Sequence, residues 1–148
     1  MANPVYVLPD PMLALAQYLR LRPELTALVP ASNIITQSPA TLVYPYVLIT
    51  LAGGGSAAPW PAVDEASMQI DVITDNIFTV AGRSAGQSVS SLIARTVRAA
   101  VWAISNDVVP AGCLSAGFEE LAPQWFPDVV TTPPLARFMA RYRIILHP

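Results

Sequence analysis

The residue types that support enzymatic chemistry are scarce in this sequence. Its single histidine, His147, stands next to the last residue, where chain ends fray and a general base beside a nucleophile is not expected. Its single cysteine, Cys113, excludes an intrachain disulfide and a cysteine-based zinc cluster. All eight basic residues are arginine, so a phosphate-binding loop with its lysine is absent. The sequence therefore predicts no enzyme and no cofactor.

Acidic residues occur as two adjacent pairs, Asp64 with Glu65 and Glu119 with Glu120. Neighbouring side chains on a strand point to opposite faces of the sheet, so neither pair forms a two-carboxylate catalytic site. Metal binding through these pairs is disfavoured for the same reason. We predict no metal site.

One group of arginines and a tryptophan share a helix side. Trp102 lies four residues after Arg98 and seven after Arg95, opposite the apolar stripe of the same predicted helix. An outward tryptophan at this place is either a lid on the arginine stems or an anchor for a contact with another subunit. The sequence leaves both interpretations open.

A second group of arginines alternates along the last predicted strand. Arg137, Arg141 and Arg143 face one way, and the apolar residues between them face the other. Such a ladder is either a solvated sheet face with local acidic partners or a set of salt bridges across a subunit boundary.

Large aromatic side chains stand in two proline-bounded loops. Trp60 lies in the first loop, and Trp125 and Phe126 lie in the second. Each ring either pins its loop onto its own domain or docks to a different protein. Flanking prolines lower the entropy that such a loop loses when it is ordered at an interface.

The composition indicates a thin polar coat. Charged residues make up 12% of the chain, where about 25% is usual, and hydrophobic residues reach 53% with a mean hydropathy of +0.47. Apolar stretches such as Pro45–Ala52 are too short to span a bilayer, and Met1–Asn3 carries no basic residue of a secretory signal, so we expect a cytoplasmic product without membrane contact. So much apolar surface is therefore expected to be buried in contacts between subunits.

Hydrophobic periodicity and turn residues predict the elements. Asp10 before Pro11 is typical of a helix start, and the following pattern predicts a helix to about Leu21. The other expected elements are a short turn at 23–29, strands at 34–37, 45–52, 68–72, 113–121 and 136–146, and a long helix at about 84–104. On strand 113–121 the inward residues are expected to be Leu114, Ala116 and Phe118.

These elements predict one α+β domain over residues 1–148. Two main helices are expected to pack on one mostly antiparallel mixed sheet of about five strands, in the order α-β-β-β-α-β-β, as a two-layer sandwich. Long loops rich in proline or glycine are expected at about 53–66 and 122–135.

The ordered set of segments resembles the phage tail terminator and tail completion family, also called tail-to-head joining proteins. The matching segments include Leu25–Val29 before Ile34–Ile35, the strand start Tyr44-Pro45-Tyr46, the strand Met68–Val72, the helix segment Val97–Val101 and the closing strand Arg137–Ile144. The likeness covers most of the chain. The long loops at about 53–66 and 122–135 depart from the usual pattern of the family.

The resemblance implies a non-enzymatic virion subunit. Members of this family assemble in the host cytoplasm as a homohexameric ring, which lies at the tail-neck junction of the virion. The ring caps the tail tube, stops the polymerisation of the tube and presents its other face to the head connector or neck protein. DNA passes through the hole without being read, and Asp64, Glu65, Glu119 and Glu120 are candidates for its lining.

Other functions remain open on the sequence alone. A neck or head completion ring protein belongs to the same structural class, and a small-molecule binding module or a minor enzyme with a backbone site would show an apolar cavity under the sheet. A nucleic-acid binder is disfavoured by the net charge of −2 and the pI near 5.1.

Overall fold

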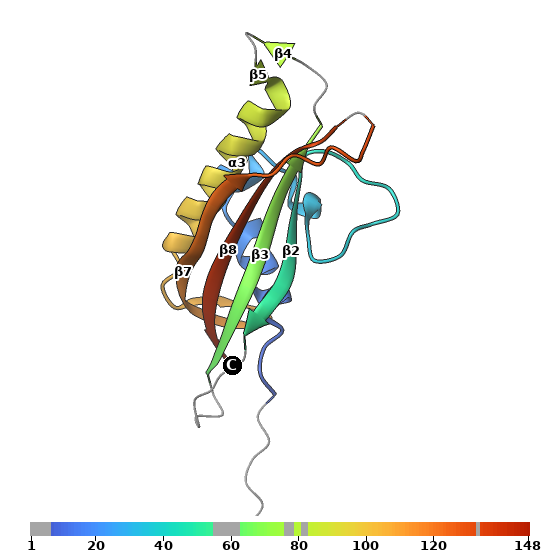
Figure 1. Cartoon of the computed structure of the whole chain (residues 1–148). Helices are drawn as coiled ribbons and strands as arrows, with labels where there is room; N and C mark the ends of the chain where they lie inside the picture. Colours follow the sequence, from blue (N-terminus) through green and yellow to red (C-terminus); the bar gives the residue numbers. More distant parts are fainter. Residues whose placement is uncertain (1–6, 55–62, 76–78, 81–82, 133) are drawn as a thin grey trace, which may run out of the picture.

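The computed structural model describes residues 7–54, 63–75, 79–80, 83–132 and 134–148. A six-stranded sheet, in the order β1-β2-β3-β8-β7-β6, has helices on one face only (Figure 1). The elements are α1 (Pro11–Arg20), α2 (Pro23–Thr26), the 3-10 turn η1 (Ala31–Asn33), β1 (Ile34–Ile35), β2 (Tyr46–Gly54), β3 (Asp64–Thr74), β4 (Thr79–Val80), β5 (Arg83–Ser84), α3 (Ala85–Trp102), β6 (Asp107–Val109), β7 (Gly112–Trp125) and β8 (Ala136–His147).

The predicted α+β class is confirmed, and the sheet differs from the expectation in two respects. Only β1 and β2 pair in parallel, so the sheet is mixed and mostly antiparallel as predicted. It has six strands instead of five, because the turn after α3 continues into β6, and it curls around the helices instead of forming a flat layer (Figure 1). No helix in the described ranges has the length and apolar character needed to cross a bilayer.

The first helix begins where the sequence predicts. The Asp10 carboxylate accepts hydrogen bonds from the backbone N–H groups of Met12 (3.0 Å) and Leu13 (3.1 Å), and Pro11 occupies the first helical position. The buried side of α1, with Leu15 and Leu19, packs into the core between the helices and the sheet.

The long helix α3 passes close to the sheet at Gly117 of β7. A Cβ atom at this position would lie 2.6 Å from the carbonyl oxygen of Val101, so only glycine allows this approach of helix and strand. The predicted apolar stripe is confirmed at Ile93, Val97, Ala100, Val101 and Ile104, which are buried in the same core. It was wrong at Val89 and Leu92, which are 44% and 43% exposed.

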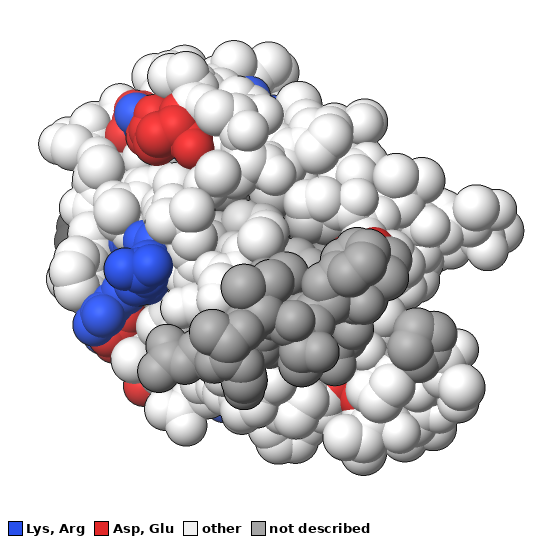
Figure 2. All heavy atoms as spheres, turned by 90° about the horizontal axis from the view of Figure 1, so that it is seen from above, with Lys and Arg blue, Asp and Glu red and all other residues white. Residues whose placement is uncertain are grey.

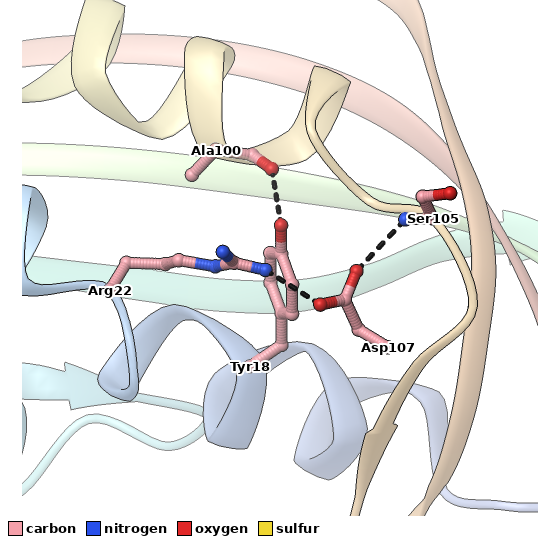
Figure 3. A network of polar contacts seen from close by, with 5 residues as sticks. All are labelled: Tyr18, Arg22, Ala100, Ser105 and Asp107. Atoms are coloured by element: carbon pink, nitrogen blue, oxygen red, sulfur yellow. Dashed lines mark hydrogen bonds and ion pairs between the residues drawn. The ribbon is translucent and has the colours of Figure 1, made fainter.

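A polar network ties the two main helices to the start of β6 (Figure 3). The buried Tyr18 hydroxyl donates to the carbonyl oxygen of Ala100 at 2.7 Å, and burial raises the pKa of this phenol. The Arg22 guanidinium lies 4.0 Å above the Tyr18 ring and pairs with Asp107 at 2.9 Å. Asp107 also accepts the backbone N–H of Ser105 at 2.8 Å. The network therefore fixes the turn that leads from α3 into β6.

A smaller apolar cluster lies apart from the main core, at the end of the sheet near β1. Its buried members are Tyr46, Ile73 and Leu135, and burial raises the pKa of the Tyr46 phenol. Residues of the segment between β1 and β2, including Leu42 and Tyr44, pack against it. The cluster covers this end of the sheet.

Three local predictions were wrong. Part of each predicted loop belongs to strands, because β2 extends to Gly54, β3 begins at Asp64 and β7 continues to Trp125. Ala116 and Phe118 pair with the outward residues Ile145 and Arg143 and point away from the core, and Phe118 is 45% exposed, whereas Leu114 is buried as predicted. The pairing of β7 with β8 shifts between Leu114 and Ala116, and this bulge reverses the inward and outward positions that follow.

Two tyrosine variants test the assignment of the buried hydroxyls. Tyr18→Phe removes the hydrogen bond to Ala100, and we expect it to lower the free energy of unfolding by about 1 kcal/mol. The Tyr142 hydroxyl is also buried but has no hydrogen-bond partner among the described residues. Tyr142→Phe is therefore expected to change stability by less than about 0.5 kcal/mol or to increase it. Urea unfolding measures both, and equal losses would contradict the assignment.

Candidate assembly interface

The sheet face turned away from the helices, here called the open face, carries the arginine ladder of β8. Ala140, Tyr142 and Ile144 are buried under the helices, so the alternating residues Arg141 and Arg143 point to the opposite side. The predicted alternation of the last strand is thus confirmed. On the open face, β8 lies between β3 and β7, which supply the possible partners.

Arg137 is held by a local acidic partner on β3. Its Nε and Nη2 atoms lie 2.8 Å and 2.7 Å from Oδ1 of Asp71, and Gln69 donates to Oδ2 of the same carboxylate at 2.9 Å. Asp71 is only 3% exposed, so this carboxylate requires its partners. The Phe126 ring lies 5.6 Å from the guanidinium carbon. Arg137 therefore has a structural role within the subunit.

The other two arginines of the ladder are much less engaged. Arg143 lies 3.9 Å from Glu65 and 5.5 Å from the Phe118 ring, with both charged side chains about half exposed, so the ion pair is weak. Arg141 is exposed, and no described residue forms an ion pair, hydrogen bond or ring contact with it. Of the two interpretations of the ladder, local pairing therefore fits Arg137 best, and Arg141 is the position left for an external partner.

The predicted group on α3 lies at the helix–sheet boundary. Arg98 donates through Nη2 to Glu119 at 2.8 Å, and its Nε lies 2.6 Å from the second carboxylate oxygen in an ion pair without hydrogen-bond geometry. Trp102 lies over the Arg98 guanidinium at 4.3 Å but remains 56% exposed. The lid geometry is therefore present, and most of the ring is still open to a partner. Arg95 is exposed, and its Nε donates to the Ser91 carbonyl oxygen of the same helix at 3.4 Å.

Tyr142 is buried beside this ion pair. It is the register partner of Glu119 across β7 and β8. Burial raises the pKa of its phenol, and the negative charge of Glu119 raises it further. The Tyr142 hydroxyl therefore stays neutral. Beside it, the positive charge of Arg98 and the negative charge of Glu119 neutralise each other.

The second aromatic loop is exposed at the end of the sheet where β7 leads into β8. Trp125 packs its ring 5.3 Å from that of Phe138, yet it remains 39% exposed, and Phe126 is 56% exposed. Val129 and Val130 in the same connection are 72% and 90% exposed. These contacts fit the reading in which the rings pin the loop onto their own domain. Docking to a different protein stays a prediction. Trp60 lies outside the described residues.

The four acidic candidates for the hole lining do not form one group. Glu65 lies on the open face beside Arg143, and Glu120 of β7 accepts a 2.5 Å hydrogen bond from Ser67. Glu119 instead pairs with Arg98 toward α3, and Asp64 is placed at the first position of β3. Within the described ranges, no three potential metal-ligating side chains come together.

A groove of about 650 Å³ lies at the opposite end of the sheet and was not predicted from the sequence. It is lined by the segment before α1, the β6–β7 turn and the end of β8, including His147. Val7, Leu13 and Val108 expose 84%, 41% and 80% of their surfaces there. The apolar segment Val-Val-Pro at 108–110 was the sequence feature that could have indicated this groove. Because turn residues surround the segment, the edge strand β6 was not predicted.

No family model matches the sequence, and no curated protein matches it. Among solved structures, the fold is similar to that of a chain in the virion of a native gene transfer agent (GTA) particle, with a TM-score of 0.62 and 20% sequence identity. The alignment covers 93% of this chain and 95% of the other. The two chains share a fold.

The unequal roles of the ladder arginines can be tested with methionine, which keeps an unbranched apolar stem and removes the charged guanidinium. Arg137→Met leaves the Asp71 carboxylate buried without its cation, and we expect a loss of about 2 kcal/mol in the free energy of unfolding. The matched control Arg143→Met removes a weak, exposed ion pair and is expected to cost less than about 0.5 kcal/mol. Equal losses in denaturant titrations would contradict the assignment.

Proposed function

We propose that this chain is a structural subunit of a phage-like virion and, more specifically, a tail terminator that forms a ring. The observation that carries the proposal is the likeness of fold to a chain of a gene transfer agent virion over nearly the full length of both chains. The resemblance of the ordered sequence segments to the tail terminator family supports the same assignment.

The surface supports a role in assembly. Figure 2 shows one end of the molecule, where charged residues form a few small clusters and most of the visible surface is uncharged. Exposed apolar side chains occur on the loop after β7, on α3 and around the groove beside β6. Apolar surface of this kind is stabilised by burial against another subunit or another virion protein.

The proposed mechanism is steric. A homohexameric ring binds the last ring of the tail tube with one face, stops further growth, and offers its other face to the head connector or neck protein. In this arrangement Trp60, Trp125 and Phe126 serve as docking residues, and Arg141 and the α3 group of Arg95, Arg98 and Trp102 serve at subunit contacts. Glu65 and Glu120 serve to keep the passing DNA from adhering, since like charges repel phosphates.

Two alternatives have less support from the described residues. A neck protein would form a ring of similar composition and bind the portal instead of the tube, and only its copy number and partner distinguish it. A small-molecule module would present an apolar cavity under the sheet. The groove of the described chain instead lies open at the end of the sheet.

Native mass spectrometry of the purified chain tests the ring. Six copies are expected for a terminator, whereas twelve would favour a neck protein and one a ligand-binding module. Incubation with unfinished tail tubes and electron microscopy should show the ring on tube ends. A chain that stays monomeric when concentrated and ignores tube ends would contradict the proposal.

Alanine variants test the docking loops. Trp60→Ala and Trp125→Ala are expected to leave a folded subunit that yields tails of wrong length or tails without heads, because the rings supply contact area and no catalytic step. Circular dichroism melting checks that each variant is folded. Normal particles from both variants would exclude docking through these loops.

A further inference from the structure

Two stretches of the main sheet have no neighbouring strand among the described residues. On one edge, β6 pairs only with Gly112, Cys113 and Leu114 of β7, so β7 is unpaired on that side from Ala116 to Trp125. On the other edge, β1 pairs only with Val47 and Leu48, so β2 is unpaired from Ile49 to Gly54. Unpaired backbone N–H and C=O groups at a sheet edge are a template for another strand.

The two open stretches lie at the same height in the sheet. The strand registers connect Gly54 to Ala66, Ala66 to Ile144 and Ile144 to Gly117 in one row across β2, β3, β8 and β7. A second row, two pairs further along β3, runs in the same way from Leu51 to Glu119. The same rows of the sheet therefore end in unpaired backbone on both sides.

The directions of the two edge strands also match. Each of the three pairings between β2 and β7, through β3 and β8, is antiparallel, so β7 runs opposite to β2. A rotation about an axis along the strands keeps these directions. It therefore brings β7 of one copy beside β2 of the next copy in an antiparallel arrangement, which hydrogen-bonds well.

We propose that the β7 edge of one subunit, from Ala116 to Leu121, pairs with the β2 edge of a second copy, from Ile49 to Gly54. This inference rests on the proposed ring and names the surface that closes it. The two edges are different surfaces of one chain, so the contact is head-to-tail, and a head-to-tail contact closes into a ring when its rotation divides a full turn.

The side chains beside these edges suit burial between copies. Phe118 on the open face and Trp102 on the helix side flank β7, with 45% and 56% of their surfaces exposed. Leu51 on β2 is 53% exposed. Next to it, Gly53 and Gly54 carry no side chain that would obstruct an approaching strand. Pairing would therefore bury exposed apolar groups together with the unpaired backbone groups.

Hydrogen exchange followed by mass spectrometry, on the full chain as an assembled ring and as diluted subunits, tests this surface. Amides in peptides covering 116–121 and 49–54 are expected to exchange at least tenfold more slowly in the ring, because new interstrand hydrogen bonds protect them. Amides of 107–109 in β6 are expected to exchange equally in both states. A ring without this protection would overturn the edge pairing and leave the proposed ring function standing. Absence of any assembly would defeat both.

A charge placed at the edge gives a second test. Phe118→Lys is expected to raise the dissociation constant of the assembly at least tenfold without changing the melting temperature of the subunit, since the side chain is exposed. Leu21→Lys is the matched control at the end of α1, where the side chain is 68% exposed and lies on neither edge, and it is expected to leave assembly unchanged. Equal effects of the two variants on assembly would overturn the proposal.

Discussion

A sheet covered by helices on one face only leaves a second face and two edges to be stabilised by other means. In this protein α1 and α3 cover one face, and Gly117 allows α3 to approach the sheet closely. The second face is stabilised at one end by the small cluster around Tyr46 and along β8 by the pairing of Arg137 with Asp71. Neither of these contacts reaches the unpaired stretches of β2 and β7 at the sheet edges.

Much of the architecture followed from local sequence rules. The Asp10-Pro11 start of α1 and the stripe of Ile93, Val97 and Val101 on α3 lie where capping and periodicity place them. The ends of the strands were harder to predict from the sequence. The glycines at 53–54 and the proline at 123 are typical of turns, but here they lie near irregular strand ends. The bulge after Leu114 depends on pairing with β8, so the outward position of Phe118 could not be read from alternation alone.

The sequence predicted which residues lie at the candidate interface better than it predicted which residues they contact. The alternation of β8 placed Arg141 and Arg143 on the correct face, and the helical spacing brought Arg98 and Trp102 together. Which arginine has a local partner depends on residues distant in sequence, as the contact of Arg137 with Asp71 shows. Glu119 and Glu120 are adjacent in sequence but face opposite layers, an outcome fixed by the strand and its bulges.

The irregular pairing of β7 with β8 has a consequence for the subunit before it meets any partner. Register shifts between Leu114 and Ala116 and between Glu119 and Leu121 leave only a four-residue regular run between them, and another shift follows before Gln124. A run this short is a poor seed for amyloid-like fibres, whose growth needs longer, flat strands. The newly synthesised chain can thus present an unpaired strand in a crowded cell and still resist indiscriminate polymerisation.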